Sequence, residues 1–233
     1  MTQFQSIISQ IDSVSIFVID TVFAKKDYVP LDLSKDNLEL KAVDVASSGS
    51  LGIFVDQQIK SKNGKIAYGG YLETRGIYQR SEHFNIESSP QDERNIHLGV
   101  DIWANVGTIV LATLDSEVHS FSNNLNHGDY GPTIILKHQI DDFTFYTLYG
   151  HLSLASLSGL EIGMQFKQGE TIAQLGSAEV NGDYPPHLHF QIIIDIENYS
   201  GDYPGVSSIN NLGFYRANCP DPNLLLNLGG RIN

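Results

Sequence analysis

Two histidines flank a single leucine in the stretch PPHLHFQIII, residues 185–194. β-Branched and aromatic residues that follow paired prolines are typical of a β-strand. Because successive side chains of a strand point to opposite faces, His187 and His189 would share one face and Leu188 would lie on the other. Two neighbouring imidazoles can bind a metal, activate water or simply form hydrogen bonds, and this motif alone does not choose among these roles.

A second pair of polar residues lies in IHLGVDIW, where His97 and Asp101 are four positions apart. Gly99 and Val100 disfavour a helix. On a strand, an even separation also places both side chains on one face. Gly99 lies between them on that face, and its missing side chain leaves room for a metal ion.

Catalytic zinc typically takes three protein ligands from His, Asp and Glu and keeps one position for water. His97, Asp101 and one of the two strand histidines supply such a set. The other strand histidine would then lie beside the open position, where a base is required. A further histidine, His151, follows the aromatic-rich segment FTFYTLYG. The pattern therefore predicts three groups that bind zinc and two that act on water and substrate.

The motifs HLGVD, YGHL and HLHF, in this order, resemble those of the lysostaphin/LytM-type zinc metalloendopeptidases, which have the duplicated hybrid motif β fold. The resemblance covers roughly residues 94–195 and continues between the motifs, in GVDIWANVGTIVLATLDSEV and GMQFKQGETIAQLG. It implies zinc ligands at His97, Asp101 and His189 and catalytic histidines at His151 and His187. It also implies a β core crossed by a groove, and hydrolysis of peptide bonds, often in peptidoglycan cross-bridges.

The chain departs from the family pattern at two places. The approach to HLHF is NGDYPPH instead of a glycine-rich segment, and Gln191 stands where an acidic residue is common. Neither departure falls on a ligand or catalytic position. Tyr149 and Tyr184 flank the motifs and could line the groove or donate to a tetrahedral intermediate, or could simply pack. His83, in the N-terminal segment, could reach the zinc as an inhibitory fourth ligand, but the sequence favours a role outside the site.

The composition fits a folded chain with a sizeable core: of 233 residues, 41% are hydrophobic and 18% charged. The formal net charge of −13 argues against nucleic-acid binding, which usually requires a basic face. The single cysteine, Cys219, excludes an intramolecular disulfide and a cysteine-based zinc cluster. No base motif accompanies it, so we do not expect it to act as a nucleophile.

The expected architecture is mainly β. From about residue 95, short strand-like runs alternate with turn signals, which predicts an antiparallel sandwich or barrel-like core. We assign residues 91–233 to a zinc metallopeptidase domain and residues 1–90 to a mixed N-terminal extension, of unknown role, that packs on the core. Within that extension, residues 4–11 could form a short helix, and Asn63-Gly64 is typical of a hairpin turn. Near the C-terminus, PNLLLNL is expected to fold back onto the core.

The N-terminal stretch lacks a basic region and the chain has no run long enough to span a membrane, which predicts a cytoplasmic protein. A chain from which a leader had been removed would instead be extracytoplasmic. The function that the sequence favours is a zinc metalloendopeptidase, a hydrolase acting on a peptide or peptidoglycan-type substrate. The alternatives are a non-catalytic zinc-binding or regulatory module, and a cytoplasmic peptidase or amidase with a substrate outside the cell wall.

Overall fold

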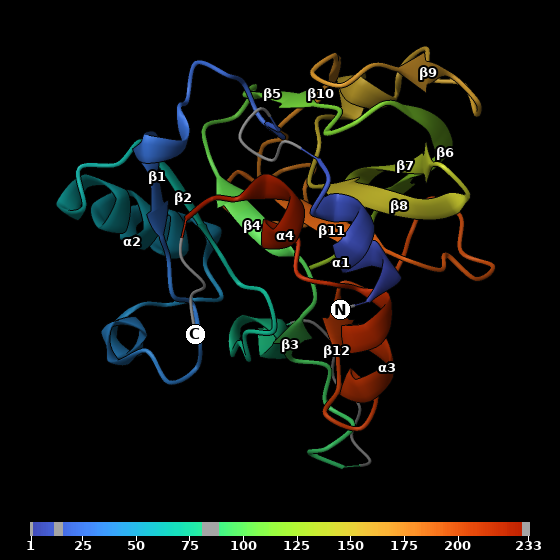
Figure 1. Cartoon of the computed structure of the whole chain (residues 1–233). Helices are drawn as coiled ribbons and strands as arrows, with labels where there is room; N and C mark the ends of the chain where they lie inside the picture. The colour runs from blue at the N-terminus through green and yellow to red at the C-terminus, as the bar shows by residue number, and fades with distance from the viewer. Residues whose placement is uncertain (1, 12–15, 81–88, 230–233) are drawn as a thin grey trace.

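The computed structural model describes residues 2–11, 16–80 and 89–229 (Figure 1). Its centre is an eight-stranded sheet whose strands follow the order β1 (Tyr28–Pro30), β2 (Ile66–Gly69), β4 (Val100–Trp103), β11 (His187–Ile193), β8 (Phe143–Gly150), β7 (Gly131–Ile140), β6 (Ser116–Asn124) and β9 (Gln165–Phe166). The strands β1 and β2 pair in parallel, and the other neighbouring pairs of this sheet are antiparallel. The prediction of a mainly β fold built on an antiparallel sheet is therefore confirmed.

Two short strand pairs complete the β structure. The first joins β5 (Ile109–Leu111) to β10 (Thr171–Gln174), and the second joins β3 (Ile96–His97) to β12 (Val206–Ser207). The β5–β10 pair lies above strands β7, β8 and β11 of the main sheet in Figure 1, and its Val110 and Ala173 belong to the same core cluster as Ile134 and Phe190 of the sheet. This second layer gives the core the sandwich-like character that the sequence predicts.

Helices are short and lie around the sheet. The α-helices are α1 (Gln3–Ile8), α2 (Ser48–Ser61), α3 (Leu212–Asn218) and α4 (Asn223–Leu226). Short 3₁₀ helices span Lys25–Asp27, Leu38–Ala42, Ile77–Arg80 and Leu154–Leu157. In α4, Leu225 and Leu226 are fully buried in the main core, so the C-terminal tail folds back as expected.

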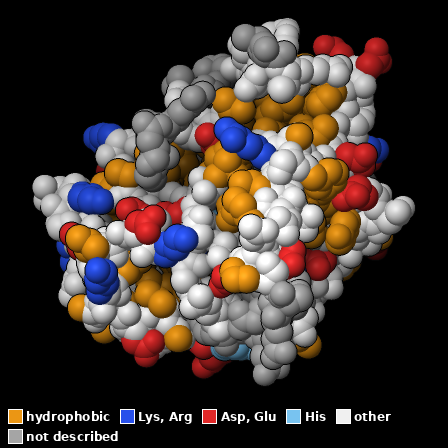
Figure 2. Space-filling view, turned by 90° about the horizontal axis from the view of Figure 1, so that it is seen from below, with side chains coloured by type: hydrophobic (Ala, Val, Ile, Leu, Met, Phe, Trp, Pro, Cys, Tyr) orange, Lys and Arg blue, Asp and Glu red, His pale blue; other side chains and the backbone are white. Residues whose placement is uncertain are grey.

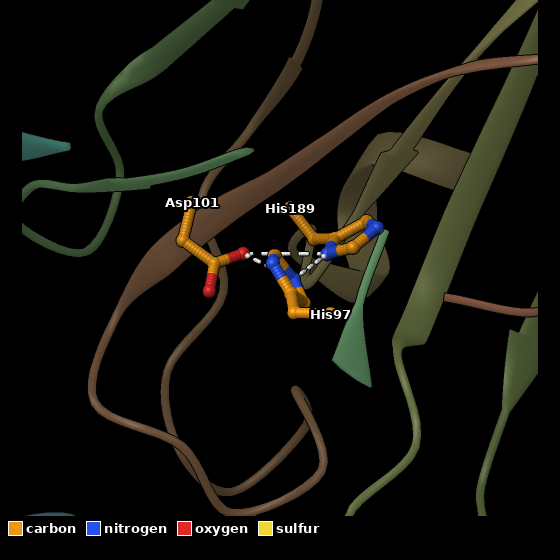
Figure 3. Close-up of side chains that lie close together, drawn as sticks. All are labelled: His97, Asp101 and His189. Atoms are coloured by element: carbon orange, nitrogen blue, oxygen red, sulfur yellow. Dashed lines mark hydrogen bonds and ion pairs between the residues drawn. The ribbon is translucent and has the colours of Figure 1, made fainter. Parts of the chain in front are cut away.

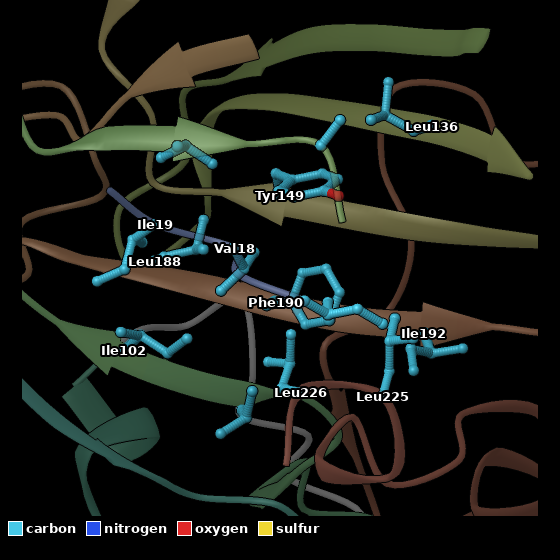
Figure 4. Close-up of a cluster of buried hydrophobic side chains, with 14 of the residues drawn as sticks. Val18, Ile19, Ile102, Leu136, Tyr149, Leu188, Phe190, Ile192, Leu225 and Leu226 are labelled. Atoms are coloured by element: carbon cyan, nitrogen blue, oxygen red, sulfur yellow. The ribbon is translucent and has the colours of Figure 1, made fainter. Parts of the chain in front are cut away.

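The central strand β11 separates the core from the opposite face of the sheet. Leu188, Phe190 and Ile192 alternate along it and point into the largest apolar cluster, where none of the three is exposed to solvent (Figure 4). Burial of one such side chain stabilises the fold by about 1.5–3 kcal/mol. Because the pleat fixes this alternation, His187 and His189 must lie on the other face of the strand.

The Asn63-Gly64 dipeptide ends a helix, and the predicted hairpin turn there is wrong. The helix α2 runs up to this point, Asn63 takes a left-handed φ of 54°, and the Gly64 amide donates to the Ile59 carbonyl at 3.0 Å. A left-handed residue with such a bond is a common helix stop. The following strand, β2, then enters the main sheet and pairs with β4. A boundary near residue 90 stays a prediction, but the sheet itself is continuous across that point.

The surface carries charges of both signs. On the face seen in Figure 2, lysine and arginine side chains are scattered among acidic ones, with apolar side chains between them. Within the described ranges, each helix is too short or too polar to cross a membrane.

Candidate metal centre and catalytic histidines

The pairing of three neighbouring strands brings four of the five predicted residues together, namely Asp101, His151, His187 and His189. The central strand β11 lies between β4 and β8, and His189 pairs with Asp101 on one side and with Gly150 on the other. Directly opposite residues of an antiparallel pair have Cβ atoms about 4.5–5.5 Å apart. His151 directly follows Gly150 at the end of β8. The sheet therefore gathers residues far apart in the sequence on one face.

Three ligand atoms converge on one point (Figure 3). His97 Nε2 lies 2.8 Å from His189 Nδ1 and 3.2 Å from Asp101 Oδ1, and His189 Nδ1 lies 3.3 Å from the same oxygen. Ligands about 2.0–2.1 Å from a tetrahedral zinc ion are about 3.3 Å from one another. The spacing of the three atoms is thus close to what a zinc ion would require.

The remaining ring nitrogens identify the tautomers of the two imidazoles. His97 Nδ1–H donates to the Gly70 carbonyl at 3.0 Å, and His189 Nε2–H donates to Gln191 Oε1 at 2.9 Å. The orientation of the Gln191 amide is set because its own NH₂ donates to the Pro204 carbonyl at 3.1 Å. In the neutral imidazoles, the lone pairs of His97 Nε2 and His189 Nδ1 therefore point at each other and at Asp101.

Asp101 supplies the negative charge of the centre. Its Oδ2 accepts from Arg75 Nη1 at 2.5 Å, whereas Oδ1 is buried and accepts no hydrogen bond from the described residues. Although burial alone would raise the pKa of Asp101, His97 and Arg75 hold it well below its usual range. Burial also lowers the pKa of His97 to about 4, so this imidazole is neutral at pH 7. Three converging lone pairs with no proton between them fit a bound cation such as zinc.

Gly99 is required by the position of His189. A Cβ atom at residue 99 would lie 2.7 Å from both Cε1 and Nε2 of His189 and 2.7 Å from the Phe190 carbonyl oxygen. Gly99 thus leaves room at the site, as its position between His97 and Asp101 in the sequence predicts. The occupant of that room is the imidazole of His189, which reaches the metal position through it.

The two histidines predicted to be catalytic lie beside this centre. His187 Nδ1–H donates to the Pro185 carbonyl and His151 Nδ1–H to the Asn181 carbonyl, each at 2.8 Å. Their ring centroids are 4.2 Å apart, and His187 Nε2 lies 3.8 Å from Asp101 Oδ1. Burial lowers the pKa of His187 to about 4 and that of His151 well below its usual value. Each ring is therefore neutral at pH 7, with an Nε2 lone pair available.

The surrounding backbone and rings hold both imidazoles in place. His187 stacks on Trp103, with centroids 4.1 Å apart and an angle of 20° between the planes. His151 has a left-handed φ of 62°, its amide donates to the Tyr130 carbonyl at 2.9 Å, and its own carbonyl accepts from Gly176 at 3.0 Å. A non-glycine residue in this conformation costs of order 1–3 kcal/mol, so the surrounding contacts must hold His151 in it.

A cavity of about 220 Å³ gives access to these groups. Aromatic side chains form much of its wall, and they include Tyr78, Trp103, Tyr130 and Tyr184. Tyr184 lines the cavity beside the ring of His151, with centroids 5.1 Å apart, and its hydroxyl donates to the Gly128 carbonyl.

Two residues with possible functional roles, Tyr149 and Cys219, lie outside the catalytic face of the site. Tyr149 is fully buried, and its hydroxyl lies within hydrogen-bond distance of the Thr113 and Thr147 hydroxyls, so it packs in the core. Cys219 is buried, and burial raises its pKa to about 12, which excludes a reactive thiolate at neutral pH.

The structure brings together all five residues singled out by the motifs, and it adds three partners that the sequence argument missed. Gln191 could have been found, because it lies two positions after His189 on the same strand face. Gly70 and Arg75 carry no local signal, since they come from the N-terminal segment and meet the site only through the fold. His83 lies outside the described residues.

The site and the sheet together define a protein with a buried candidate metal site and two adjacent neutral histidines. Residues 95–200 match the model of peptidase family M23. This matched region contains all five motif residues, so that part of the chain is a peptidase family M23 domain. The resemblance to lysostaphin/LytM-type enzymes is thereby confirmed.

Solved structures of similar proteins include two of lysostaphin from Staphylococcus simulans and one of a zinc-containing peptidase from Vibrio cholerae. The lysostaphin catalytic domain is 25% identical over 52% of this chain and 80% of that domain, with a TM-score of 0.37. Lysostaphin itself is 26% identical over 52% of this chain and 44% of its own, with a TM-score of 0.35.

The V. cholerae peptidase is 27% identical over 45% of this chain and 29% of its own, with a TM-score of 0.35. The chain thus spans less than half the length of these two longer relatives. Because all three TM-scores are below 0.5, family membership rests on the matched region and its motifs. A search of curated proteins gives no match.

Proposed function

We propose that the protein is a zinc-dependent metalloendopeptidase that hydrolyses peptide bonds with an activated water molecule. The observation that carries this proposal is the convergence of two imidazole lone pairs and an unpaired carboxylate oxygen at mutual distances of 2.8–3.3 Å. His97, Asp101 and His189 would hold the metal. Zinc bound there would lower the pKa of its water and polarise the scissile carbonyl.

The two other histidines would have separate roles in hydrolysis, one in proton transfer and one in orienting the water or stabilising charge. His187 carries its lone pair on Nε2, 3.8 Å from the carboxylate oxygen that faces the metal position. This nitrogen would accept a proton from the attacking water and pass it to the departing amine. His151, whose ring lies next to that of His187, would orient the water or stabilise the developing oxyanion.

The substrate class follows from the family and from the shape of the site. Peptidase family membership supports a peptide substrate, and we extend this to peptidoglycan-type cross-links because the S. simulans relative is an antimicrobial peptidase. A cavity of about 220 Å³ with aromatic walls would admit a narrow peptide with small side chains beside the scissile bond.

The test combines metal analysis with an activity screen on one preparation. We expect about one zinc ion per chain, and cleavage of glycine-rich peptides or peptidoglycan fragments that is lost after chelation and restored by zinc. His187→Ala protein, purified in the same way, controls for a contaminating peptidase. Absence of tightly bound metal after zinc is added back would refute the proposal. Zinc binding without any hydrolysis would favour the non-catalytic binding module instead.

A further inference from the structure

The segment that follows β2 lies directly against the metal centre. Strand pairing places Gly69 opposite Asp101. Beyond the strand, the Leu72 amide donates to the His97 carbonyl at 2.9 Å, and the His97 amide donates to the Glu73 carbonyl at 3.0 Å. The Arg75 amide donates in turn to the carbonyl of Asn95 at 2.8 Å. Residues 70–75 are thus held in register with the strand that carries His97.

This segment holds the outer atoms of two of the three candidate ligands. The Gly70 carbonyl accepts from His97 Nδ1, and Arg75 Nη1 donates to Asp101 Oδ2 at 2.5 Å. Arg75 Nε donates at the same time to Glu73 Oε2 at 2.5 Å, and the Arg75 side chain is only 5% exposed. A guanidinium fixed by two carboxylates has little freedom to move, so it fixes the plane of the Asp101 carboxylate.

The opposite charges of Glu73 and Arg75 cancel beside the position where a cation would bind. An arginine alone beside a metal position would repel a divalent ion, because like charges in a buried site are poorly screened. Glu73 offsets that charge, so the Glu73–Arg75 pair adds no net charge to the site. The negative charge of Asp101 then remains available to the metal, while Oδ2 is occupied and only Oδ1 faces His97 and His189.

Gly70 permits this packing. Its φ is 106°, and a Cβ atom there would lie 2.0 Å from Arg75 Nη2 and 2.9 Å from His97 Nδ1. Any other residue would displace the Arg75 guanidinium and the His97 imidazole, in a backbone conformation that L-residues rarely adopt.

We infer that residues 70–75, although they precede the matched family region, are a working part of the metal site, with Arg75 and Glu73 as positioning residues. Arg75 holds Asp101 as a ligand through one oxygen, and Glu73 neutralises Arg75 so that the cation is not repelled. This inference rests on the proposed zinc function and assigns a role to a segment in which the sequence shows no catalytic motif.

The test measures zinc affinity by chelator competition and the absorption spectrum of the cobalt-substituted protein. Loss of a partner of a metal ligand typically weakens metal binding by about 10- to 100-fold, and we expect a loss in this range for Arg75→Met and for Glu73→Gln. The Glu73→Gln/Arg75→Met double variant removes both buried charges, so it should regain folding stability yet keep the weakened binding and an altered cobalt spectrum. If the two residues had a purely structural role, the double variant would regain folding stability, zinc affinity and the wild-type cobalt spectrum together. Arg216→Met, at an exposed arginine of α3, is the matched control.

The outcomes distinguish the role of residues 70–75 from the proposed zinc function. If the wild-type protein binds zinc while the variants bind it equally well and with an unchanged cobalt spectrum, the inference is wrong and the proposed function stands. If the wild-type protein binds neither metal, the proposed function fails and the inference with it. Should Arg75→Met not fold, Glu73→Gln and the double variant decide the matter by the same two measurements.

Discussion

Gly99→Ala should displace a metal ligand by adding one methyl group. The new Cβ atom would lie 2.7 Å from His189 Nε2 and Cε1, whereas ordinary contacts begin at 3.4 Å, so the imidazole must move by at least about 0.7 Å. The Phe190 carbonyl, also 2.7 Å away, is backbone of the paired strand and cannot yield freely. Metal–ligand distances tolerate only about 0.2 Å. Since loss of a ligand's partner already costs about 10- to 100-fold, we expect zinc affinity to fall at least about 100-fold.

The assay compares zinc affinity with the stability of the metal-free protein. Overpacking of a filled site typically costs about 1–3 kcal/mol, so the metal-free variant should unfold at a lower urea concentration. Added zinc should stabilise the wild-type protein and leave the variant almost unchanged, because the stabilisation depends on the ratio of free zinc to the dissociation constant. Gly76→Ala is the control, since no atom lies within 4 Å of a Cβ at that position.

Wild-type zinc affinity in a folded Gly99→Ala protein would refute this reasoning. It would mean that the imidazole of His189 is free to move without loss of the site, and hence that His189 is not a ligand. A variant that unfolds equally with and without zinc, but retains the secondary structure of the wild type, would support the displacement of the ligand.

Three further predictions concern the other histidines and the core. His189→Ala should lose zinc, whereas His187→Ala and His151→Ala should keep it and lose about 10²- to 10⁴-fold in turnover. Metal analysis and peptide cleavage check this. Loss of zinc from His187→Ala, with zinc retained in His189→Ala, would reverse the assignment. Burial lowers the pKa of His138 from 6.5 to about 4, so the folded state favours the neutral ring. Its contribution to stability is complete above pH 6.5 and is lost as the pH falls towards 4, by about 2 kcal/mol between pH 7 and 5. Urea unfolding of His138→Gln should show a correspondingly weaker pH dependence, and an unchanged dependence would contradict the shift. Leu188→Ala, at a fully buried position, should lower the free energy of unfolding by about 2–5 kcal/mol in the same assay, and a loss below 1 kcal/mol would place Leu188 outside the core.

Much of the site could be predicted from the sequence because its signals are local. Alternation along HLHFQII identifies which side chains share a strand face, and the same rule applied two residues further would have identified Gln191 as the partner of His189. The motifs supply residue types, and antiparallel pairing then leaves few ways to bring His189 and Asp101 together. The prediction of strands from about residue 95 succeeded for the same reason, since β-branched and aromatic runs there alternate with turn residues.

The N-terminal segment could not be predicted in this way, because its role depends on contacts distant in sequence. Asn63-Gly64 is a turn signal in a hairpin and a stop signal after a helix, and only the length of α2 decides between them. Arg75 is separated from Asp101 by 26 positions and joins it because β2 pairs with β4. No periodicity in residues 70–75 indicates that a buried arginine will meet a buried carboxylate.

The buried charges give a physical reason why the site and the N-terminal segment belong together. Glu73 and Asp101 each carry a negative charge and Arg75 carries one positive charge, so these three side chains together have a net charge of −1. A buried, uncompensated carboxylate is costly. A divalent cation changes the net charge to +1 and gives the unpaired Asp101 Oδ1 a partner. Without Arg75, the Glu73 and Asp101 carboxylates would both lose the guanidinium that they share. We therefore expect Arg75 to offset the charge of the metal-free cluster, and Glu73 to limit the repulsion between that arginine and a bound cation.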